Sequence, residues 1–436
     1  MDEKFALRKG VNVLVSGLKR WLRLSVISGL IALILAPGLP VKAATTKVGK
    51  VPARAAYVMD ATSGQVLYQQ NADKRYPIAS LSKLLTVYLT VQAINDGKIA
   101  WDDQVPMARN LIKLSHSFAY SSLRMKNGEQ FTVRQLVAAA MIASSNSAAT
   151  ALGEYVAGSN ARFVAQMNQQ SEDWGLEAHF ISSSGLDNTD LKDYDLVLPD
   201  TGKSEENLVS AKAISIVAQQ LLKADPTITQ VASKTQESIN GTKIFNENSC
   251  LPGQTQYKKE SQIDGLKTGF TENAKLCFTA TYTVDGQRMV ATILGGDTTF
   301  SAMNKLIKQL KASYQLETTP LSSQTISLSN GLATKVTAQP TTSQAGVWYQ
   351  DKTAALTTKV ETKLTPTQLS RGMVGVGDPV AQATVTDTQT GAKQLVTYKA
   401  QQAATLFAER AVFAAKHQTD QLMQALVAPM QHATSK

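Results

Sequence analysis

The chain of 436 residues has few of the residues that build metal centres or histidine-based catalytic sites. Its four histidines are scattered, and none forms a pair at the spacing of metal ligands: His116, His179, His417 and His432. None of them lies near a polar motif, so nothing in the sequence points to a Ser-His-Asp triad. Aromatic residues make up only 6% of the chain, but 43% hydrophobic residues still indicate an ordinary globular protein.

Cysteine is equally scarce, since Cys250 and Cys277 are the only two. In an exported chain, two cysteines can form a disulfide. The alternative is a pair of buried free thiols. The sequence leaves both open because it does not show whether the two α-carbons come within bridging distance.

Long apolar runs are also missing, apart from one near the N-terminus. The uncharged run 24–36 has about 13 residues, short of the roughly 20 that span a bilayer. It follows a basic segment and precedes Val41 and Ala43, fairly small residues that suit cleavage after Ala43. We therefore expect an exported chain with a signal peptide over residues 1–43. An uncleaved membrane anchor is the alternative.

The charge is modest once this segment is set aside. The whole chain has a net charge of +10, but residues 1–43 hold seven basic and two acidic side chains. The remainder therefore has 37 basic and 32 acidic residues, a net charge of +5. This balance suits an anionic envelope surface and does not indicate nucleic acid as a partner.

At about 100–200 residues per domain, the length favours two or three domains. We expect the segment 101–131 to be irregular. Hydrophobic periodicity and turn residues predict a hairpin over 55–60 and 66–69, helices over 80–95, 132–142, 147–156, 211–224 and 300–314, and strands over 263–270, 278–284 and 289–294.

The composition changes near Gln315. From there to about Ala400 the chain is rich in Thr, Ser and Gln and alternates at period two, which predicts a small antiparallel β domain. Residues 401–428 have helical character, with apolar residues gathered on one side. This amphipathic helix would lie on a membrane surface or dock on protein, and the pattern only slightly favours the membrane.

Three polar motifs interrupt otherwise apolar structure. Ser80 and Lys83 lie three residues apart, so on a helix they share one face, where a hydroxyl beside an amine is a nucleophile beside a base. Taken alone, Ser80 is better explained as a helix N-cap and Lys83 as a solvated first-turn residue. Ser144-x-Asn146 follows at a junction between two predicted helices, and Lys267-Thr268-Gly269 lies on a predicted strand.

The order of these motifs resembles the signature of penicillin-binding proteins and serine β-lactamases. The chain is similar to the serine-type D-alanyl-D-alanine carboxypeptidases, the low-molecular-mass penicillin-binding proteins. The likeness covers about 55–314. The segments that carry it, besides the three motifs, are Met59–Gly64, Pro77–Thr86, Phe180, Gly185–Asp187, Asn246–Asn248 and Asp264–Thr271.

The resemblance implies an α+β fold, in which a penicillin-binding, β-lactamase-like transpeptidase domain combines an antiparallel sheet with helices. With the boundaries above, the expected order is a signal peptide over 1–43, a D,D-peptidase domain over 44–314, a β-rich domain over 315–400, and an amphipathic helix over 401–436. That helix is a possible membrane anchor.

The resemblance also implies roles for the first two motifs. Ser80 would form the acyl ester, and Lys83 would be the general base, with its charge disfavoured by burial and by nearby Lys267. Ser144 would relay a proton to the leaving amine. Asn146 would hold the substrate amide.

The third motif would bind the substrate. Lys267 would supply positive potential, Thr268 a hydroxyl for the terminal carboxylate of D-alanine, and Gly269 room for close approach. The backbone N–H groups of Ser80 and Phe270 would form the oxyanion hole. Where this chain has Phe270, some relatives have histidine, so the role of that histidine side chain is lost here. Asp297 stands where some relatives have arginine, which affects the positioning of the substrate.

The expected activity is removal of the terminal D-alanine from peptidoglycan stem pentapeptides, with penicillin acylating the same serine and no metal or organic cofactor. The expected location is the outer face of the cytoplasmic membrane and the cell wall. A serine β-lactamase, a transpeptidase and a non-catalytic β-lactam-sensing or wall-binding protein are the alternatives. No Glu-x-x-Leu-Asn-type segment follows Ser144 to support the first of these.

Overall fold

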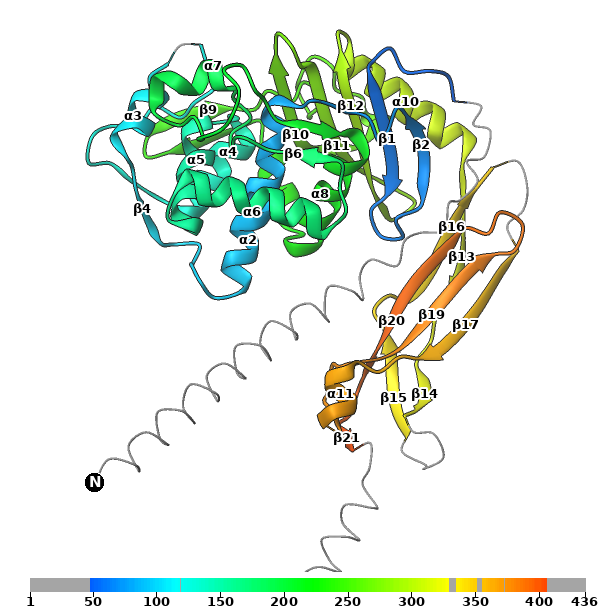
Figure 1. Ribbon diagram of the computed structural model, residues 1–436. Coiled ribbons are helices and arrows are strands. Elements are labelled where there is room, and N and C mark those ends of the chain that lie inside the picture. Colours follow the sequence, from blue (N-terminus) through cyan, green and yellow to red (C-terminus); the bar gives the residue numbers. More distant parts are fainter. Residues whose placement is uncertain (1–47, 118, 329–334, 351–354, 372, 406–436) are drawn as a thin grey trace, which may run out of the picture. The chain divides into compact units, whose positions relative to one another are not determined.

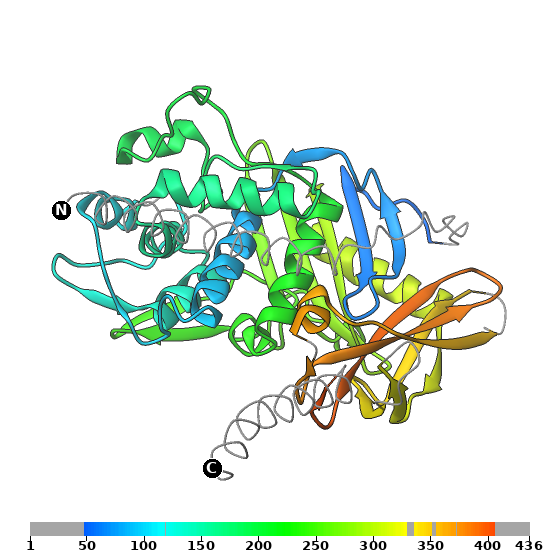
Figure 2. The same cartoon turned by 60° about the horizontal axis from the view of Figure 1, so that its bottom comes forward.

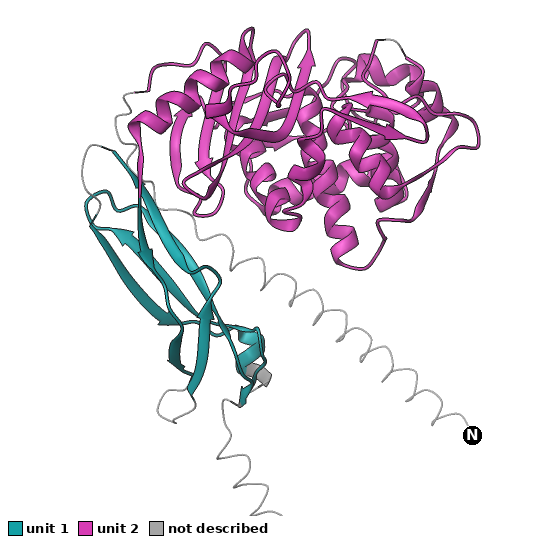
Figure 3. Ribbon diagram, turned by 180° about the vertical axis from the view of Figure 1, so that it is seen from behind, with its two compact units in different colours: residues 1–42, 317–436 teal, residues 43–316 magenta. Residues whose placement is uncertain are grey.

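The structure is a computed structural model that describes residues 48–405, except 118, 329–334, 351–354 and 372. The predicted signal peptide and most of the predicted C-terminal helix lie outside the described residues. The chain divides into two compact units between Leu316 and Glu317 (Figure 3). The unit that comes first along the chain, magenta and labelled unit 2 in Figure 3, is called the first unit, and the teal one is called the second unit.

The first unit contains a five-stranded antiparallel sheet in the order β10-β11-β12-β1-β2 (Figure 1). The predicted hairpin and the three predicted strands near residues 263–294 are confirmed. The strands are β1 (Ala55–Asp60), β2 (Val66–Gln70), β10 (Ile263–Thr271), β11 (Lys275–Val284) and β12 (Gln287–Gly296). β10 forms one edge of this sheet, so one side of its backbone is free to face other elements.

Two helices cover opposite faces of the sheet, because neighbouring residues of a strand point to opposite sides. Thr292 of β12 accepts a hydrogen bond from Ser215 of α8 (Ala211–Ala224) at 2.7 Å, and it pairs across the sheet with Thr279. The next residue on β11, Phe278, instead packs edge-on against Phe300 of α10 (Thr299–Ser313), with ring centroids 5.2 Å apart. α8 and α10 therefore lie on different faces (Figures 1 and 2).

The helix α2 (Lys83–Asn95) is the centre of the helical part of this unit. Its residues are apolar on nearly all sides, which is typical of a fully buried helix. It packs against α8 and against α4 (Val133–Ile142), α5 (Asn146–Ala157) and α6 (Asn160–Asp173). Thr132 and Gln135 form a capping box that begins α4, as the sequence at that point favours.

Short elements complete the first unit. The prediction of an irregular segment over 101–131 is wrong for the helix α3 (Arg109–Ser115), whose residues Leu111 and Leu114 are buried in the core. A single helix of two turns gives too few apolar repeats to stand out in a sequence. The short elements are β3 (Arg75–Pro77), η1 (Ala79–Ser82), β4 (Gln104–Pro106), α3 (Arg109–Ser115), β5 (Gln130–Thr132), β6 (Ala178–His179), α7 (Asn188–Leu191), η2 (Lys192–Tyr194), β7 (Leu208–Ser210), α9 (Ile228–Ala232), β8 (Gln236–Ile239), β9 (Thr242–Phe245) and η3 (Lys259–Ser261).

The second unit is dominated by an antiparallel sheet in the order β14-β15-β20-β19-β17. Its core contains Val336, Val380, Val396 and Tyr398. The main strands are β14 (Gln324–Ser327), β15 (Lys335–Pro340), β17 (Leu356–Thr362), β19 (Pro379–Asp387) and β20 (Lys393–Ala400). The smaller elements are β13 (Gln315–Pro320), which pairs with β16 (Gln344–Tyr349), the helix α11 (Pro366–Arg371), and β18 (Met373–Val374), which pairs with β21 (Ala404–Thr405).

The expected helix over 401–436 is wrong at its start. Residues 401–403 are not helical, and Ala404 pairs with Val374 in the ladder of β18 and β21. The alanine-rich sequence favours a helix locally, but pairing with a distant strand overrides that preference. The rest of the expected helix lies outside the described residues. Among the helices that the structure describes, none has the length and apolar character required to cross a membrane.

Candidate active site

Ser80 lies in the 3-10 turn η1, between β3 and α2, rather than inside a regular helix. Two glycines let neighbouring segments press against this turn. A β-carbon on Gly269 of β10 would lie 3.1 Å from the Ser80 nitrogen. A β-carbon on Gly185, where φ is +90°, would lie 2.0 Å from the Ala79 oxygen. The backbone around Ser80 is therefore held from two sides.

Lys83 is the first residue of α2, and its side chain is fully buried. Its Nζ lies 2.7 Å from Ser80 Oγ, 2.7 Å from Asn146 Oδ1 and 2.6 Å from the Ser184 carbonyl oxygen. The last two groups can only accept, so they fit the two N–H donors of a neutral amine. The remaining lone pair then faces the Ser80 hydroxyl.

The charge of Lys83 is disfavoured by its surroundings. Burial lowers the pKa of Lys83 well below its ordinary value, and nearby Lys267 lowers it further. The carboxylate of Glu247 opposes both effects. A neutral lysine within hydrogen-bond distance of a serine hydroxyl can accept its proton.

The second motif lies at the junction between α4 and α5. Ser145 caps α5 by accepting from the Ala148 nitrogen at 3.3 Å, and Asn146 donates through Nδ2 to the Ser121 carbonyl at 3.2 Å. The amide oxygen of Asn146 is thereby turned to Lys83. Ser144 is buried, with a left-handed backbone at φ +54°. Asn146, rather than Ser144, makes the hydrogen bond from this junction to Lys83.

The third motif lies on the edge strand β10. Lys267 is 2% exposed and donates to the Thr268 carbonyl oxygen at 2.9 Å. Burial lowers the pKa of Lys267 to about 8, and Glu247 again opposes the shift. Lys267 is therefore mostly an ammonium at neutral pH. Phe270 continues the strand, and its side chain is 60% exposed.

Four residues that were not predicted from the sequence complete this arrangement. Ser184 supplies a carbonyl oxygen to Lys83, and Asn207 donates to Ser82 Oγ at 2.7 Å and to the Ser182 carbonyl at 2.8 Å. The others are Ser121, which supports Asn146, and Glu247, which contacts Thr268. The serine run 182–184 was a possible signal, because consecutive polar residues beside the apolar Phe180 require buried partners.

This chain has Asp297 where some relatives have arginine. Another arginine, Arg54, lies at the same end of the sheet. Arg54 crosses Gly295 so closely that a β-carbon there would lie 2.5 Å from Arg54 Cδ. Arg54 donates to the Asn273 carbonyl at 2.8 Å, in the turn between β10 and β11. Arg54, from the segment before β1, therefore places a guanidinium beside the turn between β10 and β11.

The suggested disulfide is not formed, since Cys250 and Cys277 are both buried free cysteines. Cys277 lies on β11 with its sulfur 3.7 Å from the Pro77 carbonyl, whereas Cys250 lies 3.9 Å from the Phe300 carbonyl. The two thiols thus face different neighbours. Burial raises the pKa of each to about 12, so both remain protonated at neutral pH.

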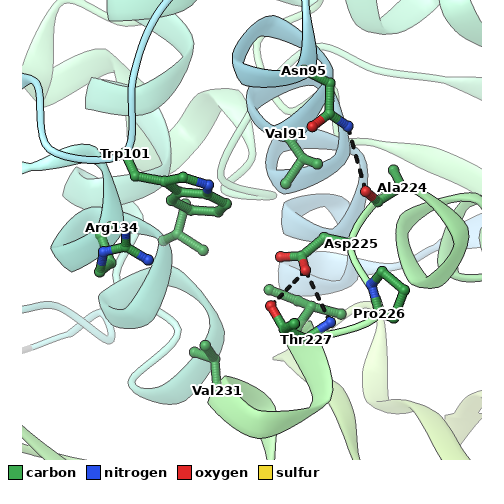
Figure 4. A pocket seen from close by; sticks show the side chains of 11 residues that line it. Val91, Asn95, Trp101, Arg134, Ala224, Asp225, Pro226, Thr227 and Val231 are labelled. Atoms are coloured by element: carbon green, nitrogen blue, oxygen red, sulfur yellow. Dashed lines mark hydrogen bonds between the residues drawn. The ribbon is translucent and has the colours of Figure 1, made fainter.

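A cavity of about 190 Å³ lies away from this arrangement (Figure 4). Its lining includes Val91 and Asn95 near the end of α2, with Trp101 and Arg134 opposite. Lys83 begins the same helix, and at 1.5 Å per residue the ends of α2 are about 18 Å apart. The cavity is therefore separate from the serine–lysine pair.

The fold and this geometry define a class of protein: an α+β domain with a serine–lysine pair beside the edge strand of an antiparallel sheet. The sequence model of the family described as D-alanyl-D-alanine carboxypeptidase matches residues 41–298. The chain therefore belongs to the D-alanyl-D-alanine carboxypeptidase family.

Relatives and solved structures agree with this assignment. D-alanyl-D-alanine carboxypeptidase DacF of Bacillus subtilis is 30% identical over 276 residues, which are 62% of this chain and 64% of that relative. The match thus spans less than two thirds of the relative. The peptidoglycan synthesis regulatory factor PBP3 of Streptococcus pneumoniae has a TM-score of 0.68 at 26% identity, covering 82% of this chain and all of that one. Penicillin-binding protein D2 of Listeria monocytogenes, in its cefotaxime-bound form, has a TM-score of 0.50 at 29% identity, covering 60% and 98%.

Proposed function

We propose that this protein is a serine D,D-carboxypeptidase that removes the terminal D-alanine from peptidoglycan stem pentapeptides. The observation that carries the proposal is the position of Lys83 Nζ, 2.7 Å from Ser80 Oγ and held by two acceptors. Membership of the D-alanyl-D-alanine carboxypeptidase family supports this substrate.

Acylation begins when Lys83 takes the proton of the Ser80 hydroxyl. The Oγ then attacks the carbonyl carbon between the two D-alanines, and the backbone N–H groups of Ser80 and Phe270 donate to the oxyanion. Ser144 relays the proton from Lys83 to the amine of the departing D-alanine as the C–N bond breaks, while Asn146 holds the substrate amide. Water then hydrolyses the ester on Ser80 and regenerates the hydroxyl.

The terminal carboxylate of the substrate binds at the third motif. The Lys267 ammonium supplies positive potential, and the Thr268 hydroxyl donates a hydrogen bond. Gly269 leaves no side chain between the strand and the turn that holds Ser80. The buried position of Lys267 keeps this charge close to the carboxylate and largely shielded from water.

Penicillins acylate the same serine in this proposal, because they carry a reactive amide and a carboxylate in a similar arrangement. Penicillin-binding protein D2 of Listeria monocytogenes has been solved in a cefotaxime-bound form, which supports a β-lactam as a ligand of this site. A β-lactamase would release the drug rapidly, whereas a sensor would bind it without attacking the peptide.

The test uses the purified protein with a stem pentapeptide and with fluorescent penicillin. We expect release of free D-alanine and stable labelling, both abolished in Ser80→Ala. Labelling without D-alanine release would favour a sensor, and rapid turnover of penicillin would favour a β-lactamase. Product carrying a new peptide bond would favour a transpeptidase.

We also propose an export signal over 1–43, a peptidase domain over 44–314, a β domain that extends from residue 315 to β21, and a membrane-binding segment that follows it. The exported protein would act at the outer face of the cytoplasmic membrane. A chain ending at Thr405, which keeps the ladder of β18 and β21, should leave the membrane fraction. Its retention, with the N-terminus shown to be cleaved, would contradict the role of the C-terminal segment.

A further inference from the structure

Glu247 follows β9, and its carboxylate bridges two sides of the candidate active site. Oε1 accepts from Ser121 Oγ at 2.6 Å, and Oε2 accepts from Thr268 Oγ1 at 3.3 Å. Ser121 belongs to the segment that supports Asn146, whereas Thr268 belongs to the edge strand. A carboxylate of the protein thus contacts the hydroxyl that the proposed function assigns to the carboxylate of the substrate.

The two carboxylates cannot both use this hydroxyl as a donor. A threonine hydroxyl has one proton, so Thr268 donates to one acceptor at a time. Lys267 Nζ lies 3.5 Å from Thr268 Oγ1 and is the cation that either carboxylate would neutralise. Two carboxylates at this point would also repel each other.

The Glu247 side chain has room to leave this position. The residue is exposed, whereas Thr268 and Lys267, with which it interacts, are buried. Burial lowers the pKa of Lys83 and Lys267, and the Glu247 carboxylate counteracts that change in both. Without a ligand, Glu247 therefore provides negative charge beside two buried amines.

We propose that Glu247 is a specificity-determining residue that occupies the position of the substrate carboxylate in the free protein and yields it when an anionic ligand binds. This inference rests on the proposed function. Its consequence is selective: Glu247 opposes ligands that carry a carboxylate at Thr268 and has little effect on ligands that are neutral there.

The experiment compares benzylpenicillin with its methyl ester, which lacks that charge, on the purified full-length chain. The measured quantity is the second-order rate constant of acylation. For Glu247→Gln we expect a rise of about fivefold with benzylpenicillin, the size of a repulsion between solvent-exposed like charges a few ångströms apart. We expect no rise with the ester. Ser121→Ala, which releases one end of Glu247 but keeps its charge, should give a smaller rise with benzylpenicillin.

Glu237→Gln is the matched control, because Glu237 lies on β8 of the same hairpin and pairs with Lys234 instead. It should leave both rate constants unchanged. Equal rises for benzylpenicillin and the ester in Glu247→Gln would show that Glu247 acts through Lys83 and would overturn the proposal. An unchanged or lower rate with benzylpenicillin would overturn it as well. Failure of the unsubstituted protein to be acylated at all would instead refute the proposed function on which the inference depends.

Discussion

Buried polar groups serve different ends in the two units. In residues 48–316, Lys83 contacts Asn146 and Ser184, which come from segments far away in the sequence. In residues 317–405, the buried carboxylate of Asp387 mostly accepts from its own turn, through the backbone nitrogens of Gln389 and Thr390. The first pattern assembles a site from distant segments, whereas the second closes a local turn.

The two buried groups also differ in the protonation state that they favour. Burial and Lys267 lower the pKa of Lys83, so its neutral form is favoured. Burial alone would raise the pKa of Asp387, but hydrogen bonds from Thr390, Gln389 and Ala355 lower it, so its charged form is favoured. A neutral lysine keeps a lone pair that can take a proton, so it is reactive. A buried carboxylate whose two oxygens both accept hydrogen bonds from the protein is only structural. Substitutions in the first unit should therefore change chemistry, and those in the second only stability.

The largest effect should come from Lys83→Met, which replaces the amine by an apolar side chain of similar length. We expect acylation by penicillin to fall by about 10²–10⁴-fold, the usual contribution of a general base. Asn146 and Ser184 would lose a donor, so the melting temperature should fall slightly. Stopped-flow labelling and calorimetry measure the two. Acylation at the original rate would show that Lys83 is not the general base and would contradict the difference drawn between the two units.

Next in size is the contrast between two glycines with positive φ. Gly185→Ala would place a β-carbon 2.0 Å from the Ala79 oxygen and displace the turn that holds Ser80, so we expect labelling to be lost. Gly391→Ala in the second unit meets nothing within 4 Å and costs only the left-handed backbone penalty, about 1 kcal/mol. It should label normally. Equal losses of labelling in both variants would contradict this account of Gly185.

The pH dependence should be a smaller effect. Since the pKa of Lys267 is about 8, its ammonium is present below that pH and is lost above it. Acylation by anionic penicillin should therefore decline above about pH 8, by up to tenfold per unit. In Lys267→Arg the positive charge persists to much higher pH, so the acylation rate, normalised to its value at pH 7, should not decline above about pH 8. A decline at the same pH in both proteins would assign it to another group.

The smallest effect should come from Asp387→Asn. The folded-state pKa of Asp387 lies below its unfolded value, so its contribution is present above about pH 4 and is lost as the pH falls through the folded value. We expect the free energy of unfolding to fall by about 1 kcal/mol at pH 7, which lowers the melting temperature of a unit of this size by about 4–8 °C. This difference between the two proteins should become smaller in acid. Calorimetry between pH 3 and 7 measures it. Penicillin labelling should not change, and a fall in labelling would contradict the separation of roles.

The strands and most helices of the first unit were predictable because their periods are local. The run 289–294 and the helix 211–224 have apolar residues at the spacing of their elements. The helix α3 and the strand β21 were missed because a short segment carries little periodic signal. β21 forms because Ala404 pairs with Val374, a residue far away in the sequence.

The candidate site was predictable only in part. Ser80, Lys83, Asn146 and Lys267 have side chains whose chemistry is visible in the sequence. Ser184 contributes a backbone carbonyl, a group that every residue has, so no sequence pattern distinguishes it. Glu247 lay in a segment of family likeness, but nothing in its identity showed that its carboxylate would contact Thr268.

The sequence by itself determined the order of three polar motifs, the elements that carry them and the resemblance to one enzyme family. It did so because residue type and spacing are properties of the chain. The tertiary structure alone decided that Lys83 is fully buried, that the two cysteines are free thiols, and that the Glu247 carboxylate contacts the Thr268 hydroxyl. Burial, distance and the direction of a hydrogen bond depend on which distant segments meet, and only the packed chain brings those segments together.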